Sequence, residues 1–243
     1  MIVTALIGAR IGRHNVVDVT WGGGFVLIAL ISAVTGTGEA WRRVLLLVLV
    51  GVWGLRLALH VFQRSRGHGE DPRYTELLSK ATGNETVYAL RKIYLTQAIA
   101  LWFVSLPVQV SAVAHGSVPA VVVLGVLIWT LGWTFEAVGD AQLKAFKADA
   151  SNKGKIMDRG LWSWTRHPNY FGDSAVWWGL FLVSASAWPG VFTLPSPIAM
   201  TYFLVFATGA RLLERSMEKR PGYREYQQRT SYFLPRPPKA PSR

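Results

Sequence analysis

Long apolar stretches alternate with short charged connections along this chain. A helix that crosses a membrane needs about 20 predominantly apolar residues. Six stretches qualify, with soft edges, and the fifth is short enough that we expect it to be tilted or broken; they are residues 16–35, 44–62, 87–110, 118–139, 174–189 and 196–213. Each run is continuous and does not alternate with polar residues, which disfavours a membrane β-barrel. The first nine residues could add a further helix. The pattern therefore predicts an all-α, polytopic membrane bundle of about six to seven transmembrane helices.

The connections differ sharply in charge. Three of them are rich in Lys and Arg, namely residues 63–86, 140–168 and the tail from 211 onward. The links 111–117 and 190–195 carry neither. If the chain crosses the membrane six times, all three basic segments lie on the same side. Cytoplasmic loops of membrane proteins are enriched in Lys and Arg, so we expect this side to be cytoplasmic, with both termini inside. Arg42 and Arg43 lie on the opposite side and break the pattern. We expect a multi-pass protein of a bacterial inner membrane.

Composition agrees with a membrane protein in contact with lipids. Hydrophobic residues make up 51% of the chain and charged residues 16%, against about 25% charged in soluble domains, and the mean hydropathy is +0.25. The net charge of +12 follows from topology, so we expect no nucleic-acid partner. The start, "MIVTALIGAR", is too short an apolar run for a cleavable signal peptide, and the Pro-rich end, residues 236–243, is expected to be disordered.

The residue inventory limits the chemistry. No Cys is present, which excludes disulfides, thiolate metal sites and Cys nucleophiles. The five His residues lie in different segments without the spacing of metal ligands, so we predict no metal. Their positions are His14, His60, His68, His115 and His167.

Acidic residues lie inside or at the edge of predicted spans, where polar groups are costly and indicate function by default. Asp18 lies near the start of the first span. Glu136, Asp140 and Lys147 follow helical spacing at the end of the fourth and share one face with Lys144. The alternative for Lys144 is a solvated helix end.

The stretch "LWSWTRHPNYFGD", residues 161–173, carries many polar groups beside an apolar segment. Pro168 disfavours helix at the residue before it, so we expect a helix to begin near Asn169. The free N–H groups at a helix start attract anions, and Arg166 and His167 stand beside them, so a phosphate would suit this position. A loop made basic by topology alone would explain Arg166 but not the whole sequence.

The tail combines aromatic and charged side chains. Arg211 and Glu214 follow the last span, and Tyr223 and Tyr226 come shortly after. Aromatic rings with Arg can hold a heterocycle and its phosphates. The alternative is an aromatic belt with basic flanks at the membrane interface.

These stretches resemble the C-terminal half of the steroid 5α-reductase family, and most closely its bacterial membrane branch. The resemblance rests on "FEAVGDAQLKAFK", "GLWSWTRHPNYFGD" and "LLERSMEKRPGYREYQQRTSYFLP", with "DVTWG" and "GEDPRY" supporting it in the other half. It is strong over about 136–236 and moderate over about 16–110. Sterol C14 and C7 reductases share the Arg-His-Pro-Asn-Tyr core. Isoprenylcysteine and phospholipid methyltransferases share it more loosely, with a later Glu.

The resemblance implies a helical bundle with a cytoplasm-facing cavity for NADPH. It implies one domain over residues 1–235, with a substrate-side half at 16–110 and a cofactor-binding half at 118–235. The pattern and the resemblance together give the predicted cofactor-binding set, Glu136, Asp140, Lys144, Lys147, Trp162, Arg166, His167, Asn169, Tyr170, Asp173, Arg211, Glu214, Tyr223 and Tyr226.

The catalytic pair departs from the family pattern. Animal steroid reductases hold the substrate carbonyl with a Glu and a Tyr from the N-terminal half, and no such pair stands at matching positions here. The best substitutes are Asp18 for the acid and Tyr74 or Tyr94 for the phenol.

The implied function is NADPH-dependent reduction of an activated C=C bond in a 3-oxo-Δ4 steroid-like enone or another hydrophobic lipid. Steroid, sterol, polyprenoid and unsaturated fatty acyl substrates all remain open. A rival is an S-adenosylmethionine-dependent methyltransferase of a lipid or prenylated thiol, whose cofactor carries no phosphate and needs less of the Lys and Arg at 144–166. A second rival, a non-enzymatic scaffold or lipid-binding protein, would not need intramembrane acids aligned with a polar helix start.

Overall fold

The protein is helical throughout its described part. A computed structural model describes residues 1–238, and within that range it contains helices, turns and one isolated β-bridge between Thr165 and Ser231. The predicted all-α class is confirmed. Most of the tail predicted to be disordered, from residue 239 to 243, lies outside the described residues. The chain forms two compact units, residues 1–116 and 117–243. The functional halves predicted within a single domain over 1–235 stay a prediction.

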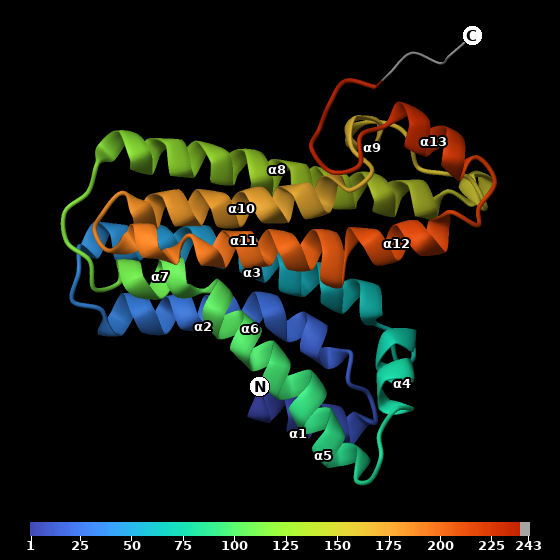
Figure 1. Cartoon of the computed structure of the whole chain (residues 1–243), viewed down its shortest axis with the longest axis horizontal. Coiled ribbons are helices and arrows are strands. Elements are labelled where there is room, and N and C mark those ends of the chain that lie inside the picture. Colours follow the sequence, from blue (N-terminus) through green and yellow to red (C-terminus); the bar gives the residue numbers. More distant parts are fainter. Residues whose placement is uncertain (239–243) are drawn as a thin grey trace. The chain divides into compact units, whose positions relative to one another are not determined.

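The first unit is built around two long helices that pack side by side, α2 and α3 (Figure 1). A Cβ atom on Gly22 of α2 would lie 2.2 Å from the carbonyl oxygen of Gly54 on α3, so only glycine allows the backbones to come this close. Phe25 and Trp53 are buried on the same helices, with ring centroids 5.5 Å apart. The unit contains α1 (Ile2–Ile11), α2 (Val16–Thr35), α3 (Ala40–Ser65), α4 (Pro72–Leu78), α5 (Glu85–Ala89), the π-helical η1 (Leu90–Leu95), α6 (Thr96–Val104) and α7 (Leu106–Ser111).

The second unit is built around α8 and α10, which run side by side (Figure 1). Gly125 and Gly132 of α8, seven residues apart, meet Gly179 and Gly172 of α10. A Cβ atom on Gly132 would lie 2.6 Å from the carbonyl oxygen of Gly172. The unit contains α8 (Pro119–Ala148), the 3₁₀ turn η2 (Ala150–Asn152), α9 (Leu161–Trp164), α10 (Pro168–Ala185), the 3₁₀ turn η3 (Gly190–Thr193), α11 (Pro195–Tyr202), the π-helical η4 (Phe203–Ala207), α12 (Ala210–Met217) and α13 (Tyr223–Arg229).

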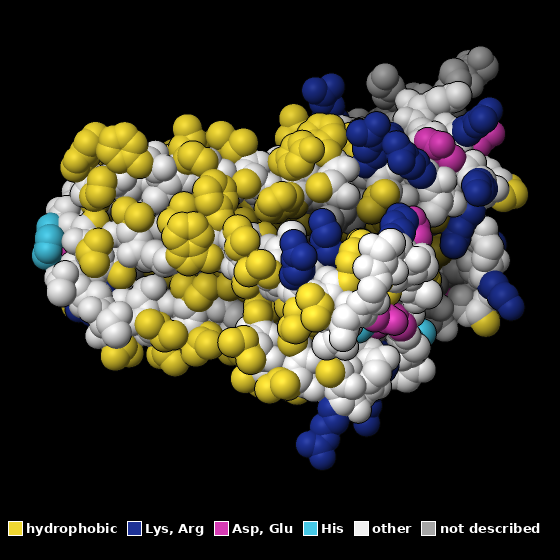
Figure 2. Space-filling view, turned by 60° about the horizontal axis from the view of Figure 1, so that its bottom comes forward, with side chains coloured by type: hydrophobic (Ala, Val, Ile, Leu, Met, Phe, Trp, Pro, Cys, Tyr) yellow, Lys and Arg dark blue, Asp and Glu magenta, His cyan; other side chains and the backbone are white. Residues whose placement is uncertain are grey.

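Four helical segments are long and apolar enough to cross a membrane: α2, α3, α8 and the composite segment Gly190–Met217. They contain or closely match four of the six predicted spans. Leu27, Leu55 and Leu127 on these helices are each more than half exposed, and hydrophobic side chains cover much of the visible surface (Figure 2). Exposed apolar surface on this scale suits lipid as a neighbour.

The other two predicted spans take a different form. The segment 87–110 is helical but passes from α to π geometry and back, and it is interrupted at Ser105 between α6 and α7. The segment 174–189 lies mostly in α10, a continuous helix of 18 residues that is not among the four candidates. The total of six to seven spans therefore stays a prediction beyond these four.

Arg42 and Arg43, which break the charge pattern, bind backbone carbonyls. Arg42 is fully buried at the start of α3, and its guanidinium donates to the carbonyl oxygens of Ala114 and Gly116. Arg43 donates to the carbonyl oxygens of Ala33 and Gly38. Both side chains therefore hold the neighbouring loop ends within the first unit, which gives a structural reason for positive charge at this position.

Candidate functional site

Close packing of α8 against α10 brings the predicted polar residues of both helices together. Gly139 of α8 lies against the Pro168 ring, because a Cβ atom there would meet Pro168 Cγ at 3.2 Å. Pro168 is the first residue of α10, where its missing N–H costs nothing, so the helix begins one residue before the predicted start. Asn169 Nδ2 then donates to Asp140 Oδ1 at 3.2 Å.

The two helices also carry three buried carboxylates, one of which accepts from the Asn169 amide. Glu136, Asp140 and Asp173 are exposed by 2%, 7% and 8%, and all belong to the predicted cofactor-binding set. The other amide atom, Asn169 Oδ1, is buried and accepts no hydrogen bond from any residue between 1 and 238. A buried acceptor without a donor is rare in folded proteins, so the amide oxygen is a ready contact for a ligand N–H or O–H group.

Glu214 of α12 forms the centre of a second polar group, close to the start of α10. Its carboxylate accepts two parallel bonds from Arg166, Nε to Oε1 at 2.8 Å and Nη2 to Oε2 at 3.0 Å. His167 Nε2 lies 3.1 Å from Oε1, and the Tyr223 hydroxyl donates to the same oxygen at 2.6 Å. Gln227 Nε2 donates to Oε2 at 2.7 Å. The anion beside Arg166 and His167 is thus the protein's own carboxylate.

The Glu214 network also ties down the C-terminal segment. Arg166 Nη1 donates to the carbonyl oxygens of Gln227, at 3.2 Å, and Thr230, at 2.7 Å. Burial and the adjacent Glu214 carboxylate raise the pKa of Tyr223, because both disfavour the phenolate. Tyr223 therefore remains a neutral donor at physiological pH.

Trp162 of α9 connects α8 with α13. Its indole Nε1 donates to the carbonyl oxygen of Gly139 at 3.0 Å, and its own carbonyl oxygen accepts the Tyr226 hydroxyl at 2.5 Å. Burial raises the pKa of Tyr226, and nearby Tyr223 raises it further. Tyr170 stacks on His167 with ring centroids 5.8 Å apart. The predicted aromatic residues Trp162, Tyr170 and Tyr226 therefore contact Gly139, His167 and Trp162, respectively.

Three predicted members lie outside these buried groups. Lys144, Lys147 and Arg211 are exposed, the first two on the last turns of α8 and the third on α12. The predicted set therefore divides into the α8–α10 acids with Asn169, the Glu214 network with its aromatic neighbours, and exposed cations.

In the first unit, two of the three predicted catalytic residues meet. The Tyr74 hydroxyl donates to Asp18 Oδ1 at 2.6 Å, although 56 positions separate the two residues in the chain. The position of Tyr74 follows from a capped helix start: Asp71 accepts the backbone N–H of Arg73 at 2.9 Å, and Pro72 follows the cap. Both features are strong signals for a helix N-terminus.

Arg73 bridges the acids of this site. Its Nη2 atom lies 3.2 Å from Asp18 Oδ2 and 2.9 Å from Asp71 Oδ2. The hydrogen bonds from Arg73 hold the pKa of Asp71 below its usual range, and the same pairing raises the pKa of Arg73. Burial and the Asp18 carboxylate raise the pKa of Tyr74. A protonated phenol thus lies beside a carboxylate and a permanent cation.

Tyr94, the alternative phenol, has a different partner. Its hydroxyl lies 2.9 Å from His14 Nδ1, and the two rings are tilted with centroids 5.8 Å apart. Tyr94 itself is buried in a small apolar core with Val17, Ile93 and Ala89. The structure therefore pairs Asp18 with Tyr74 and places Tyr94 beside His14.

Several residues of these networks were not predicted. Arg73 and Asp71 stand in "GEDPRY", where the Asp-Pro pair signals a helix start but says nothing of Asp18. Gln227 donates its side-chain amide to Glu214, and the backbone carbonyls of Gln227 and Thr230 accept from Arg166. No local sequence pattern distinguishes these two residues from the other polar residues of the tail. Each depends on a contact between segments far apart in the sequence.

Comparison with known proteins gives a family without a described function. A family model described as "Protein of unknown function (DUF1295)" matches residues 5–230. An uncharacterized protein of Schizosaccharomyces pombe is 33% identical over 93 residues, which cover 37% of this chain and 27% of the yeast protein. The match thus spans about a quarter of that relative's length. No solved structure matches the chain.

Proposed function

This chain belongs to the DUF1295 family, and we propose that it is an NADPH-dependent membrane reductase of an activated C=C bond in a hydrophobic substrate. A 3-oxo-Δ4 steroid-like enone represents the substrate class. The proposal draws on the resemblance to steroid and sterol reductases at "RHPNY" and its flanking stretches. Four apolar helices long enough to cross a membrane are in keeping with a substrate of low water solubility.

The observation that carries the proposal is the hydrogen bond between Tyr74 and Asp18. An acid and a tyrosine are the residue types by which steroid reductases hold the carbonyl of an enone. Here two such residues from distant segments lie 2.6 Å apart at the end of a candidate membrane span. Tyr74 is buried and Asp18 is half-buried, and ionisable groups at the end of a membrane span indicate function by default.

The residues of the second unit fit NADPH in kind. The buried acceptor Asn169 Oδ1 suits an amide or hydroxyl donor, and Asp140 and Asp173 suit sugar hydroxyls. Exposed Lys144 and Lys147 would face its phosphates. We propose that the Glu214 network positions the start of α10 and the tail around this site. NADPH, when bound, supplies the hydride that reduces the β-carbon of the enone.

Tyr74 would act on the substrate oxygen. Its raised pKa keeps the hydroxyl protonated, and its single hydrogen, which Asp18 accepts in the free protein, would turn to the carbonyl oxygen of the substrate and to the enolate that develops from it. The Arg73 cation, 5.7 Å from the Tyr74 ring centroid, would stabilise the same negative charge. Asp18 would orient the phenol before substrate binds. The α-carbon then takes a proton from water or from a phenol.

The proposal is tested by an enone screen with the full chain in lipid nanodiscs, following loss of NADPH absorbance. Tyr74→Phe should lower kcat by about a hundred-fold or more, the effect of losing one oxyanion donor. Tyr88→Phe, in the same unit but outside the site, should leave kcat unchanged. NADPH turnover with equal rates in wild type and Tyr74→Phe would contradict the assigned role of Tyr74.

We further propose that the protein lies in a bacterial inner membrane with both termini and the cofactor site on the cytoplasmic side. The distribution of Lys and Arg among the connections supports this orientation. NADPH is a cytoplasmic reductant, so the same orientation would place the basic segment 140–168 where the cofactor is available.

A further inference from the structure

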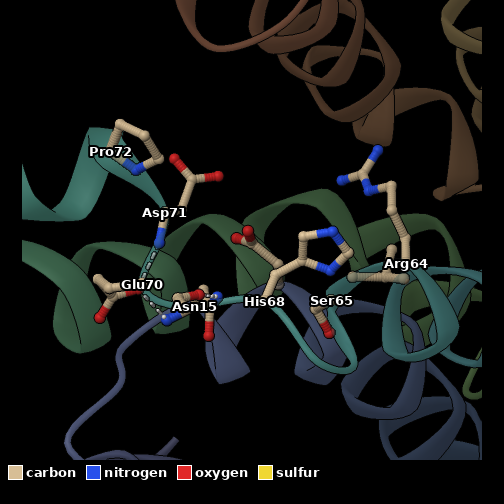
Figure 3. Close-up of a pocket in the computed structure, with 10 residues that line it drawn as sticks. Asn15, Arg64, Ser65, His68, Glu70, Asp71 and Pro72 are labelled. Carbon is tan, nitrogen blue, oxygen red and sulfur yellow. Dashed lines mark hydrogen bonds between the residues drawn. The ribbon is translucent and has the colours of Figure 1, made fainter.

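A polar pocket opens in the first unit where two candidate membrane spans end. Its volume is about 330 Å³ (Figure 3). Asn15 immediately precedes α2, and Arg64 and Ser65 end α3, so the pocket lies at the boundary between apolar helix and polar connection. It is lined by Asn15, Asp18, Val61, Arg64, Ser65, His68, Gly69, Glu70, Asp71 and Pro72.

Asn15 offers this pocket an unused acceptor. The residue is 7% exposed, and its Nδ2 atom donates to the carbonyl oxygen of Gly69 at 3.0 Å. Its Oδ1 atom is buried and accepts no hydrogen bond from the described chain. A buried acceptor left unpaired costs about 1–3 kcal/mol, so a ligand that brings an N–H donor gains by pairing with it.

One wall of the pocket carries the acidic residues Asp18, Glu70 and Asp71, which differ in their capacity to accept a hydrogen bond from a ligand. Glu70 is occupied: it accepts the backbone N–H groups of His14, Asn15 and Asp71 and holds the start of α2. Asp18 accepts two bonds, from Tyr74 and Arg73. A carboxylate has about four acceptor positions, so Asp18 can take a further donor from a ligand.

The opposite side is basic. Figure 3 shows the Arg64 guanidinium and the Asp71 carboxylate on opposite sides of the pocket, with His68 between them. Arg64 is exposed and lines the pocket, and its charge interacts with the carboxylates of Asp18 and Asp71. His68 Nδ1 lies 3.2 Å from the carbonyl oxygen of Arg66, which can only accept a hydrogen bond, so Nε2 donates to a ligand phosphate in the imidazolium form of the ring. These are donors suited to a phosphate.

We propose that this pocket binds a zwitterionic head group in which a primary ammonium is linked to a phosphate, as in phosphoethanolamine. The ammonium donates to Asn15 Oδ1 and to Asp18, and the phosphate lies against Arg64 and His68. A choline head cannot fill this role, because its nitrogen carries no hydrogen. A glycerol phosphate head lacks the cation. The pocket shares Asp18 with the proposed reductase site, but the binding of a head group is measured without NADPH or an enone.

The test is lipid binding to the delipidated full chain in detergent, measured by native mass spectrometry with phospholipids of identical acyl chains. Phosphatidylethanolamine should bind at least ten-fold more tightly than phosphatidylcholine or phosphatidylglycerol. Arg64→Gln should abolish this preference, and Arg64→Lys should retain most of it. Arg66→Gln removes the same charge two residues away, outside the pocket lining, and should leave the preference unchanged.

Two outcomes would overturn the proposal. One is equal binding of the three lipids, and the other is an equal loss of the preference in Arg64→Gln and Arg66→Gln, which would indicate an effect of general surface charge.

A competition experiment with soluble glycerophosphoethanolamine distinguishes a membrane lipid from a soluble compound as the source of this head group. Competition by the soluble compound at a similar concentration supports recognition of the head alone. Binding of the lipid without such competition supports a membrane-derived ligand. Neither binding result depends on NADPH. Failure of this proposal can therefore be distinguished from failure of the reductase proposal.

Discussion

Glu214 shows how much one side chain can organise in this protein. It accepts hydrogen bonds from Arg166, Tyr223 and Gln227 and contacts His167, so it joins the start of α10, α12 and the C-terminal segment. Its side chain is 9% exposed and that of Arg166 is 10% exposed. A bidentate ion pair at such burial is strongly destabilising to break, because the remaining charge has no partner.

We predict that Glu214→Gln lowers the stability of the protein by about 3–5 kcal/mol, the usual result of removing one member of a buried ion pair. Thermal unfolding in detergent measures the effect. Glu218→Gln is the matched control, because Glu218 is exposed one helical turn further on, and it should change little. Similar melting temperatures for the two variants would show that the Glu214 network is not structural.

The partners of the candidate site residues could not be predicted from the sequence. Asp18 and Tyr74 were both expected as catalytic residues from their type and position, yet Tyr94 could not be separated from Tyr74. The difference is a tertiary contact, since one phenol reaches Asp18 and the other reaches His14. Likewise Arg166 and His167 were expected beside an anion, but only the structure supplies Glu214 as that anion.

At the scale of the element, glycine spacing determines how α8 and α10 fit together. Gly125, Gly132 and Gly139 recur every seven residues on one helix, and Gly172 and Gly179 do so on the other. Small residues at such spacing let membrane helices approach closely and gain packing. The approach places Asp140 within hydrogen-bond reach of Asn169, so the packing builds the candidate cofactor site.

We predict that Gly132→Ala destabilises the protein by about 1–3 kcal/mol, the range for overpacking. The added Cβ atom would lie 2.6 Å from both Gly172 O and Val176 N, backbone atoms that cannot rotate away. Gly51→Ala on α3 is the control, since a Cβ atom there meets nothing within 4 Å, and the better helix propensity of Ala should add about 0.5–1 kcal/mol of stability. Equal effects on the melting temperature would contradict the close packing of α8 and α10.

Elements with simple periodicity were predictable and those shaped by packing were not. The first predicted span matches α2, because a long apolar run without breakers specifies a helix by itself. The segment 87–110 shows the same hydropathy, but the structure inserts the π-helical η1 and a break at Ser105. Glu136 and Asp140 were expected on one helical face. Asp140 meets its partner Asn169 on α10 because the glycine contacts bring the helices close, which a pattern within one helix cannot reveal.

For the whole molecule, four helical segments long and apolar enough to cross a membrane indicate a membrane protein of the DUF1295 family. The orientation we propose is based on the distribution of positive charge, and Arg42 and Arg43, which break that distribution, bind backbone carbonyls. The absence of Cys from the sequence makes every introduced thiol unique. Membrane orientation can therefore be measured directly.

We predict that Ser117→Cys reacts with an impermeant maleimide in intact bacterial spheroplasts, whereas Ser79→Cys and Ser151→Cys react only after permeabilisation. All three serines are exposed, so accessibility of the side chain is matched. The charge distribution places 63–86 and 140–168 in the cytoplasm and 111–117 outside. Labelling of Ser79→Cys in intact spheroplasts would reverse the proposed orientation of the first unit.

The most direct measurement of the central claim is thermal stabilisation of the purified protein by NADPH and, separately, by S-adenosylmethionine. A ligand at a hundred times its Kd stabilises the folded state by about 2.7 kcal/mol. We predict stabilisation by NADPH alone, diminished in Asn169→Ala, which removes the contact with Asp140, and retained in Asn84→Ala in the other unit. Stabilisation by S-adenosylmethionine and not by NADPH would contradict the reductase and identify a lipid methyltransferase.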